Sequence, residues 1–162
     1  MPDLIYRERI FARWLGALTG GLSLLFLSLF AYQALIGPLG EPAPPNLIFL
    51  GMFLIFLFLT LNFSALVVSM TTDFLRVRFG LVRRKYRWTE IEGAYKEDAT
   101  AVVYGGYGIR FGWTKGRSRV AYILPLVPRV VVPIRDGRFD ELVFSTRDPD
   151  RVIELVHHQI GG

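Results

Sequence analysis

The run NLIFLGMFLIFLFLTLNFSALVVSMTT, residues 46–72, decides the architecture predicted for this chain. It contains no Asp, Glu, Lys or Arg. A helix needs about 20 such residues to cross the hydrocarbon core of a bilayer. We therefore predict a membrane-spanning helix over residues 46–69.

A second apolar run precedes it, over residues 14–39. This run is longer than the apolar core of a signal peptide, so it is predicted to be a retained membrane helix. Four prolines and two glycines in residues 37–45 then break the helical pattern. Residues 1–72 are therefore expected to form an N-terminal segment and a two-helix transmembrane hairpin.

Lys and Arg flank the predicted helices on one side only. Arg7, Arg9 and Arg13 precede the first helix, six Lys or Arg lie in residues 76–87, and the connecting turn has none. Loops rich in Lys and Arg stay in the cytoplasm. The prediction is thus a multi-pass protein of the cytoplasmic (inner) membrane with both termini cytoplasmic.

Residues 73–162 form the predicted cytoplasmic domain. They carry 16 Lys or Arg and 11 Asp or Glu, whereas residues 14–72 carry a single charge, Glu41. A segment of this length suffices for one small domain with a modest core. The chain has no cysteine, which excludes disulfides and thiolate chemistry.

Apolar and polar residues alternate through much of this domain, which is typical of half-buried strands. Asp136-Gly137 lies between two such segments and predicts a hairpin in which the glycine takes a positive φ. The segments predicted as strands are 75–79, 82–88, 91–96, 101–104, 108–113, 119–124, 129–134 and 139–145.

The end of the domain is predicted to be helical. Asp148 can cap this helix, and Pro149 suits its first position. Its apolar face is formed by Val152, Ile153, Val156 and Ile160. The expected fold class is a membrane α-hairpin plus a small β-rich domain of about seven strands with a C-terminal helix.

This order of elements resembles the bacterial membrane-anchored PH-like family, in which two transmembrane helices precede a PH-like domain. The matching motifs are Thr71-Thr72-Asp73 with Gly80, Trp88-Thr89-Glu90-Ile91, Gly105-Gly106-Tyr107-Gly108-Ile109-Arg110, Asp136-Gly137-Arg138 and Ser145-Thr146-Arg147-Asp148-Pro149. The resemblance implies a bent sheet of seven strands capped at one end by the helix. It implies no activity, because most members have none assigned.

No catalytic, metal or cofactor site is expected. His157 and His158 are the only histidines, and adjacent helical residues point about 100° apart, which is unsuited to chelating one ion. The glycine-rich segment 105–108 lacks the Gly-Lys-Ser/Thr of a phosphate-binding loop. The protein is therefore expected not to be an enzyme.

Two sets of residues are candidate contacts for a protein partner. Small residues on the first helix leave room for a second helix, either the protein's own or that of a partner: Gly16, Gly20 and Gly21. The apolar, proline-flanked connection at 124–128 departs from the family pattern and is either buried or exposed to lipid or a partner. Its candidate contacts are Leu124, Leu126 and Val127.

A third set concerns lipid headgroups. Five cations share one face of two predicted strands, namely Arg76, Arg78, Arg83, Lys85 and Arg87. Lys and Arg beside a membrane helix also arise from topology alone. Strand 75–79 is expected to be the first to leave the membrane, which would place the turn at Gly80 away from lipid. The predicted headgroup contacts are therefore Arg13, Arg76, Arg87 and Trp88.

The preferred interpretation is a non-enzymatic, membrane-anchored PH-like adaptor that docks a protein partner at the cytoplasmic face. One alternative is an accessory subunit or assembly factor of a larger membrane complex, for example photosynthetic or respiratory. A second alternative is an anionic-lipid-sensing module. No nucleic-acid partner is expected, because a net charge of +5 on a membrane-tethered domain does not require one.

Overall fold

A computed structural model describes residues 3–97, 106–114 and 116–161 of the chain. The chain forms two compact units. One is helical, Ala12–Ser64, and the other is β-rich and combines Met1–Phe11 with Ala65–Gly162. In the sequence, the helical unit is therefore an insertion within the β-rich unit.

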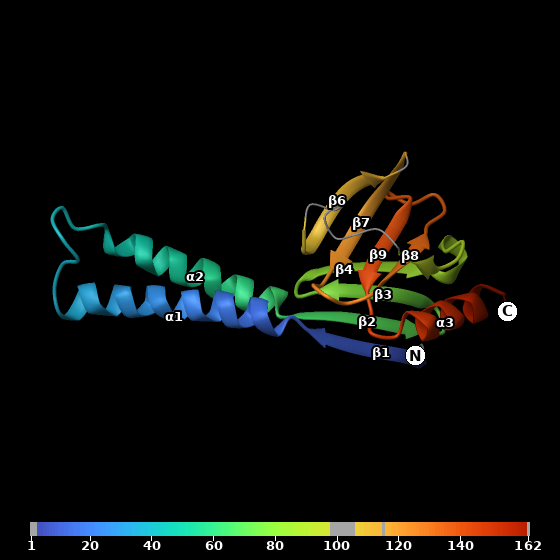
Figure 1. Ribbon diagram of the computed structural model, residues 1–162, viewed down its shortest axis with the longest axis horizontal. Helices are drawn as coiled ribbons and strands as arrows, with labels where there is room; N and C mark the ends of the chain where they lie inside the picture. The colour runs from blue at the N-terminus through green and yellow to red at the C-terminus, as the bar shows by residue number, and fades with distance from the viewer. Residues whose placement is uncertain (1–2, 98–105, 115, 162) are drawn as a thin grey trace. The chain divides into compact units, whose positions relative to one another are not determined.

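The helical unit is a hairpin of α1 (Arg13–Leu35) and α2 (Asn46–Phe63), which lie side by side (Figure 1). Both helices are long and apolar enough to cross a membrane. Within the hairpin, the Thr60 hydroxyl donates to the Thr19 hydroxyl at 2.9 Å, and the Phe26 and Phe56 rings stack with centroids 5.6 Å apart. The two predicted apolar helices are thus confirmed, with α1 ending before the expected residue 39.

The helix expected over residues 46–69 ends at Phe63, and Ala65–Thr71 form strand β2 instead. Leu66, Val68 and Met70 are fully buried in the β-rich unit. Complete burial at every second residue fits a strand, and Val67 and Val68 are β-branched residues that favour one. The boundary expected between residues 72 and 73 is therefore wrong, and the β-rich unit resumes at Ala65.

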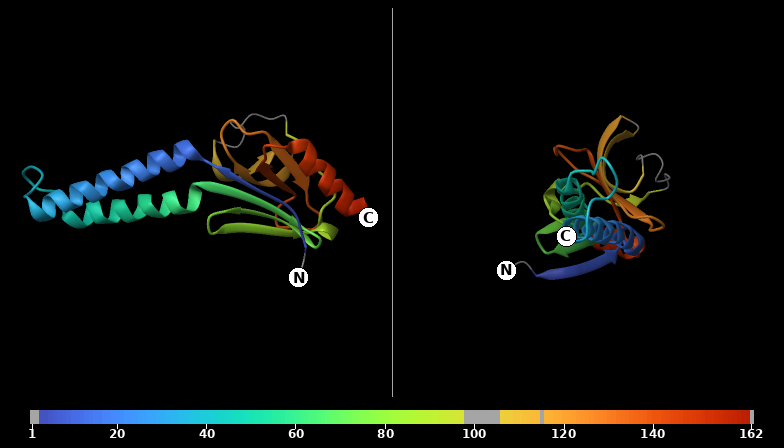
Figure 2. Two further views of the ribbon diagram at one scale, coloured as in Figure 1. Left: turned by 90° about the horizontal axis from the view of Figure 1, so that it is seen from below. Right: turned by 90° about the vertical axis from the view of Figure 1, so that its left-hand side faces the viewer.

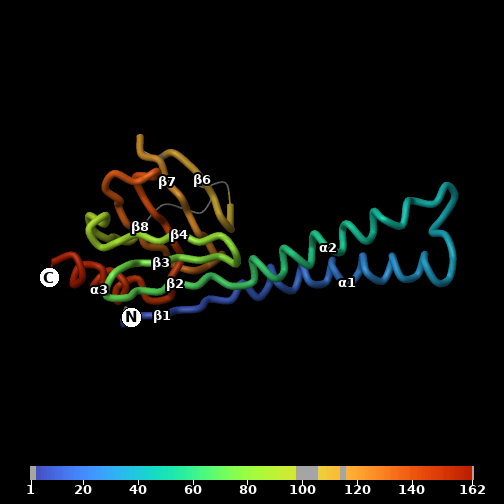
Figure 3. Tube along the Cα trace, turned by 180° about the vertical axis from the view of Figure 1, so that it is seen from behind, coloured from blue at the N-terminus to red at the C-terminus, as the bar shows by residue number. Residues whose placement is uncertain are grey.

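The first sheet is antiparallel and follows chain order: β1 (Leu4–Phe11), β2, β3 (Phe74–Phe79) and β4 (Val82–Arg87) (Figure 3). One face of this sheet belongs to the core. Together with the buried residues of β2, it contains Ile10, Leu75, Val77 and Phe79. Since side chains alternate along a strand, the residues between these lie on the opposite face.

The second sheet has the order β5-β8-β9-β7-β6. Its strands are β5 (Tyr95–Lys96), β6 (Gly108–Thr114), β7 (Arg117–Ile123), β8 (Arg129–Pro133) and β9 (Glu141–Ser145). β7 and β9 pair in parallel, whereas the pairings β5–β8, β6–β7 and β8–β9 are antiparallel. Ala121, Ile123, Val131 and Val143 form a fully buried cluster on its three central strands.

Most strand predictions are confirmed to within two residues, namely 75–79, 82–88, 108–113, 119–124, 129–134 and 139–145. Segment 91–96 contributes only β5 and an isolated bridge between Ile91 and Ile134. Segment 101–104 lies outside the described residues. The part of the chain that the structure describes has nine strands rather than about seven, because β1 and β2 were not anticipated.

The C-terminal helix is confirmed as α3 (Pro149–Gly161), which packs against β5, β8 and the short 3-10 helix η1 (Trp88–Glu90) (Figure 2). Asp148 caps it by accepting the Arg151 N–H at 3.1 Å. The helix buries Val152, Leu155 and Val156, while Ile153 and Ile160 are half-buried. Leu155 therefore belongs to the packed face as well.

The predicted β8–β9 hairpin is confirmed, but its glycine acts differently from the prediction. Asp136 has the positive φ, 53°, and Gly137 does not. A Cβ atom at Gly137 would lie 2.8 Å from Ile134 Cγ2 and 3.0 Å from the Phe139 carbonyl oxygen. Glycine is thus required here for space rather than for its backbone conformation.

Candidate anion-binding face

The exposed face of the first sheet carries cations from three of its four strands. Alternation along β1, β3 and β4 places seven of them on this side: Arg7, Arg9, Arg76, Arg78, Arg83, Lys85 and Arg87. We call this set the basic face. The four strands contain one acidic residue, Glu8, and its position in β1 places it on the opposite side with Ile10.

Strand register arranges the basic face in rows across the sheet. Arg9 pairs with Val67, which pairs with Arg78, which pairs with Arg83. In the next row, two residues further along the strands, Arg7 pairs with Ser69, which pairs with Arg76, which pairs with Lys85. Each row therefore has an arginine on either side of a short β2 residue.

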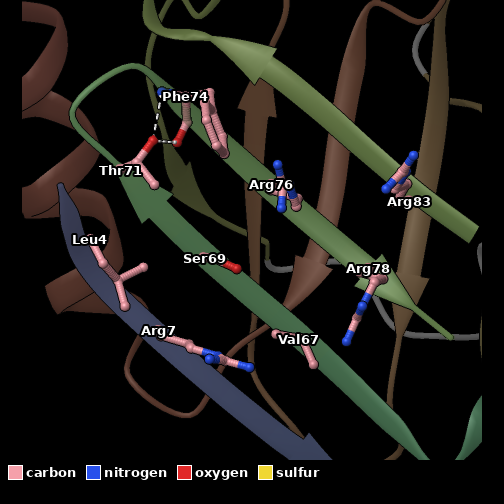
Figure 4. Close-up of a pocket in the computed structure, with 9 residues that line it drawn as sticks. All are labelled: Leu4, Arg7, Val67, Ser69, Thr71, Phe74, Arg76, Arg78 and Arg83. Atoms are coloured by element: carbon pink, nitrogen blue, oxygen red, sulfur yellow. Dashed lines mark hydrogen bonds between the residues drawn. The ribbon is translucent and has the colours of Figure 1, made fainter. Parts of the chain in front are cut away.

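Short side chains on β2 leave a hollow between these arginines. Its volume is about 260 Å³, and its lining includes Arg7, Ser69, Arg76, Arg78 and Arg83. Figure 4 shows Ser69 between Arg7 on β1 and Arg76 on β3, with the other two arginines along the same face. The hollow is thus open, cationic and centred on the strand with the shortest side chains.

Aromatic rings, rather than carboxylates, accompany the basic face. The Arg76 guanidinium lies 4.8 Å from the Phe74 ring centroid, and Lys85 Nζ lies 3.9 Å from the same centroid. Arg9 lies 4.6 Å over Phe11. The ion pairs among the described residues involve other cations, such as Lys96 with Asp150. The positive charge of this face is therefore not neutralised by carboxylates of the described chain.

Glu8 is engaged on the other side of β1. Its carboxylate accepts the Thr146 hydroxyl at 2.7 Å and the Arg147 N–H at 3.0 Å, both at the start of the segment that leads to α3. Tyr6 also donates to it at 3.1 Å, and burial together with this nearby carboxylate raises the pKa of Tyr6 to about 12. The one carboxylate of these strands is thus used to join β1 to the rest of the unit.

Trp88 and Leu124 are buried and so do not fit the contacts expected of them. Trp88 is 8% exposed and its indole N–H donates to the Thr71 carbonyl at 2.9 Å. Leu124 is 2% exposed, and its backbone N–H donates to the Ser145 hydroxyl at 2.9 Å. Both side chains serve the interior of the domain, so neither reaches a headgroup or a partner in this structure.

The remaining residues of the 124–128 connection differ from Leu124. Leu126 is fully exposed and has a positive φ of 59°, while Val127 is half-buried. A leucine in the left-handed region is strained, because its Cβ approaches the backbone. Of the three apolar residues predicted as partner contacts, Leu126 is the accessible one.

The glycines of α1 divide in the same way. A Cβ atom at Gly16 would lie 3.6 Å from Ser64 Cβ, and one at Gly20 would lie 3.7 Å from Thr60 Cγ2, so both face the protein's own α2 side of the hairpin. A Cβ atom at Gly21 would meet nothing within 4 Å. Gly16 and Gly20 therefore leave room for the protein's own hairpin, whereas the space beside Gly21 is open.

Three of the predicted headgroup contacts are accessible. Arg13 at the start of α1 and Arg87 at the end of β4 are exposed, and Arg76 is half-buried beside the hollow. Sequence reasoning missed Arg7 and Arg9, together with the β2 residues beside them. The alternation Tyr6-Arg7-Glu8-Arg9-Ile10 could have indicated a strand, but arginines before an apolar helix are also typical of the cytoplasmic flank of a membrane helix.

The premise behind the position expected for the Gly80 turn is wrong, because β2 and not strand 75–79 is the first strand after α2. Phe79 pairs with Leu66, and Leu66 follows the first residue of β2. The turn therefore lies at the same end of the sheet as Phe11 and Ala65, where the chain continues into α1 and α2. Because β2 comes before β3, it is β2 that leads away from the helices, and β3 returns toward that end.

The described residues contain no group of three or more His, Cys, Asp or Glu that could hold a metal ion. Comparisons with protein-family models, with curated proteins and with solved structures find no match for this chain. The resemblance to the PH-like family consequently stays a prediction.

Proposed function

We propose that this protein is a non-enzymatic, membrane-anchored module whose basic face binds anionic lipid headgroups. The observation that supports the proposal is that the charged residues of this face are all positive. Seven cations lie on one exposed side of four strands, and the one carboxylate in those strands lies on the other side. Topology requires only that Lys and Arg be numerous near a membrane helix, not that they share one face of a sheet.

The helical hairpin supplies the anchor in this proposal. α1 and α2 cross the cytoplasmic membrane, and both termini lie in the cytoplasm, as the flanking arginines predict. A tethered domain meets headgroups at high effective concentration, so weak individual contacts are sufficient. Each Lys or Arg near an anionic surface contributes about 1 kcal/mol. The register of Phe79 with Leu66 supports contact by the Gly80 end of the sheet in particular.

The β-rich unit is proposed to be PH-like. Its two sheets and its packed C-terminal helix support this, as does the order of motifs along the chain. The parallel pairing of β7 with β9 and the entry of the chain through β1 are features that the resemblance does not imply.

Lipid binding can be tested on the full chain in a neutral detergent. Native mass spectrometry would compare the retention of phosphatidylglycerol with that of phosphatidylcholine. We expect phosphatidylglycerol to be retained at least about tenfold better, with a preference that falls as salt is added. Reversing two charges of the basic face, with Arg78→Glu and Arg83→Glu, should remove the preference.

A matched control changes the net charge equally at exposed sites elsewhere, with Arg138→Glu and Arg147→Glu. This control should keep the preference for phosphatidylglycerol. An equal loss in both double variants would show that net charge, and not the basic face, is responsible. No preference in the unaltered chain would refute lipid binding.

A second candidate function keeps the adaptor interpretation, including its form as an accessory subunit of a larger membrane complex. The observation that favours it is Leu126, a large apolar side chain that is wholly exposed. Exposed apolar residues in a connection between strands are typical of contact surfaces when they form a patch.

Replacing Leu126 with Ser tests this adaptor. Because Leu126 contributes no buried area, the melting temperature of the β-rich unit should change little, while a native complex extracted in mild detergent should dissociate on a sizing column. Loss of stability with an intact complex would show that the connection serves only the fold.

A further inference from the structure

The hollow on the basic face has features that generic attraction to a membrane does not require. Resting on the proposed function, we propose that this hollow is a binding site for one phosphate monoester group. Ser69 lines it between Arg7 and Arg76, and Arg78 and Arg83 line it further across the sheet. A flat cationic surface would attract anionic lipids without any concavity.

The strand register places four arginines of the basic face along this hollow. Arg7 and Arg76 are the two direct neighbours of Ser69 in adjacent strands, and Arg78 follows Arg76 on the same face. Arg83 is the cross-strand partner of Arg78. Three different strands of one sheet therefore provide the four arginines, so the sheet holds their Cα atoms at fixed positions relative to one another.

Chemistry favours phosphate as the occupant. Guanidinium groups present planar pairs of donors that match phosphate oxygens, and bonds between charged partners are the stronger ones. A phosphate monoester carries between one and two negative charges near neutral pH and has three terminal oxygens. A phosphodiester has one negative charge and two such oxygens, so it cannot use four arginines as fully.

Ser69 adds a polar group to the lining of the hollow. Its hydroxyl has no hydrogen-bond partner among the described residues, whereas the nearby Thr71 hydroxyl donates to the Phe74 carbonyl at 3.3 Å. The Ser69 hydroxyl, between Arg7 and Arg76, is therefore free to donate to a ligand in the hollow. No carboxylate belongs to the lining, so nothing there repels a dianion.

The size of the hollow limits the ligand. A volume of about 260 Å³ is below the usual range for sites that enclose whole small molecules, roughly 300 Å³ and above. It suits a phosphate with a small attached group. Two sources share this chemistry, the headgroup of a monoester lipid such as phosphatidic acid and a soluble phosphomonoester.

The test uses the full chain in neutral detergent. Native mass spectrometry would measure retention of phosphatidic acid, a monoester, against phosphatidylglycerol, a diester, with phosphatidylcholine as the neutral reference. Calorimetric titration with glycerol 3-phosphate would form the soluble arm. We expect phosphatidic acid to bind roughly tenfold more tightly than phosphatidylglycerol, which is the scale of one additional charged hydrogen bond.

Charge alone would also favour a dianionic lipid, so the decisive variant leaves charge unchanged. Ser69→Leu fills the hollow and keeps every cation of the basic face. It should abolish the additional affinity for phosphatidic acid while phosphatidylglycerol binding persists. If Ser69→Leu lowers the melting temperature, Arg76→Gln replaces it and should also abolish the additional affinity for phosphatidic acid. The control Arg87→Gln lies outside the hollow lining and should weaken the binding of both lipids equally.

Each outcome decides the proposal. Binding of glycerol 3-phosphate that is sensitive to Ser69→Leu, without a lipid preference, would confirm the monoester site and assign it to a soluble ligand. A preference for phosphatidic acid that survives Ser69→Leu and Arg76→Gln would overturn the site. If phosphatidic acid and phosphatidylglycerol bind equally and glycerol 3-phosphate does not bind, the monoester site is overturned, but the proposed binding of anionic lipids stands. If neither phosphatidic acid nor phosphatidylglycerol is retained better than phosphatidylcholine, the proposed function is refuted. Binding of glycerol 3-phosphate, and its sensitivity to Ser69→Leu, would then decide whether the monoester site exists.

Discussion

A chain in which Arg13–Phe63 is replaced by Asn-Gly is expected to give a soluble, cooperatively folding β-rich domain. Phe11 pairs with Ala65, and the Ala12 N–H donates to the Ser64 carbonyl at 2.8 Å, so the two ends of the excised hairpin already lie together. A two-residue Asn-Gly turn suits the closure of antiparallel strands. The helical unit is thus expected to be dispensable for folding of the β-rich unit.

The fragment 73–162, expected from sequence to be the domain, should not fold. It lacks β1 and β2, which bury Ile10, Leu66, Val68 and Met70. Burying each such side chain contributes about 1.5–3 kcal/mol, so losing four removes roughly 6–12 kcal/mol. That is comparable with the whole stability of a typical domain, about 5–15 kcal/mol.

Circular dichroism melting and size-exclusion chromatography would check this pair. The Asn-Gly chain should elute as a monomer and melt in one transition, while residues 73–162 should show little ordered β-structure. A cooperative melt of 73–162 at the same temperature would contradict the composite domain and restore the boundary at residue 72.

Replacing Arg119 with Met is expected to destabilise the β-rich unit by about 3–5 kcal/mol, the usual cost of leaving a buried charge without its partner. The side chain of Arg119 is 6% exposed and forms ion pairs with Glu141 and, at 3.2 Å, with Glu97. Both carboxylates are also buried, with side chains 2% and 7% exposed. Met would remove the cation that these two carboxylates share, while Glu141 would keep its 3.2 Å ion pair with the exposed Arg117.

Two comparisons separate the charge effect from lost packing. The triple variant with Arg119→Met, Glu97→Gln and Glu141→Gln removes the three buried charges, leaves only the exposed Arg117 charged, and should recover much of the stability. Arg151→Met breaks the exposed pair of Arg151 with Glu154, with side chains 53% and 68% exposed, and should cost less than about 1 kcal/mol. Urea denaturation of all variants would measure these differences, and an Arg119→Met effect as small as that of Arg151→Met would show that the network contributes nothing.

Long, one-sided patterns in the sequence were sufficient for much of the fold. Uncharged apolar runs of this length are typical of long helices, so α1 and α2 could be predicted from composition, although the second run also contains β2. Period-two alternation gave β3, β4 and β6–β9, and the Asp148-Pro149 start gave α3, because each of these signals is local. The basic residues of β3 and β4 were recognised from the same alternation.

Tertiary structure alone decided the domain boundary and the candidate site. Residues 65–71 are as apolar as the helix before them, and only pairing with β1 and β3 makes them a strand with one buried face. β1 alternates as a strand does, but a basic stretch before an apolar helix is also typical of a membrane-helix flank, so its pairing with β2 is needed to identify it. Since the hollow is lined by β1, β2, β3 and β4, its arginines come from both sides of the inserted helical unit in the sequence. Long-range register, which no local pattern encodes, brings Arg7 and Arg76 to either side of Ser69.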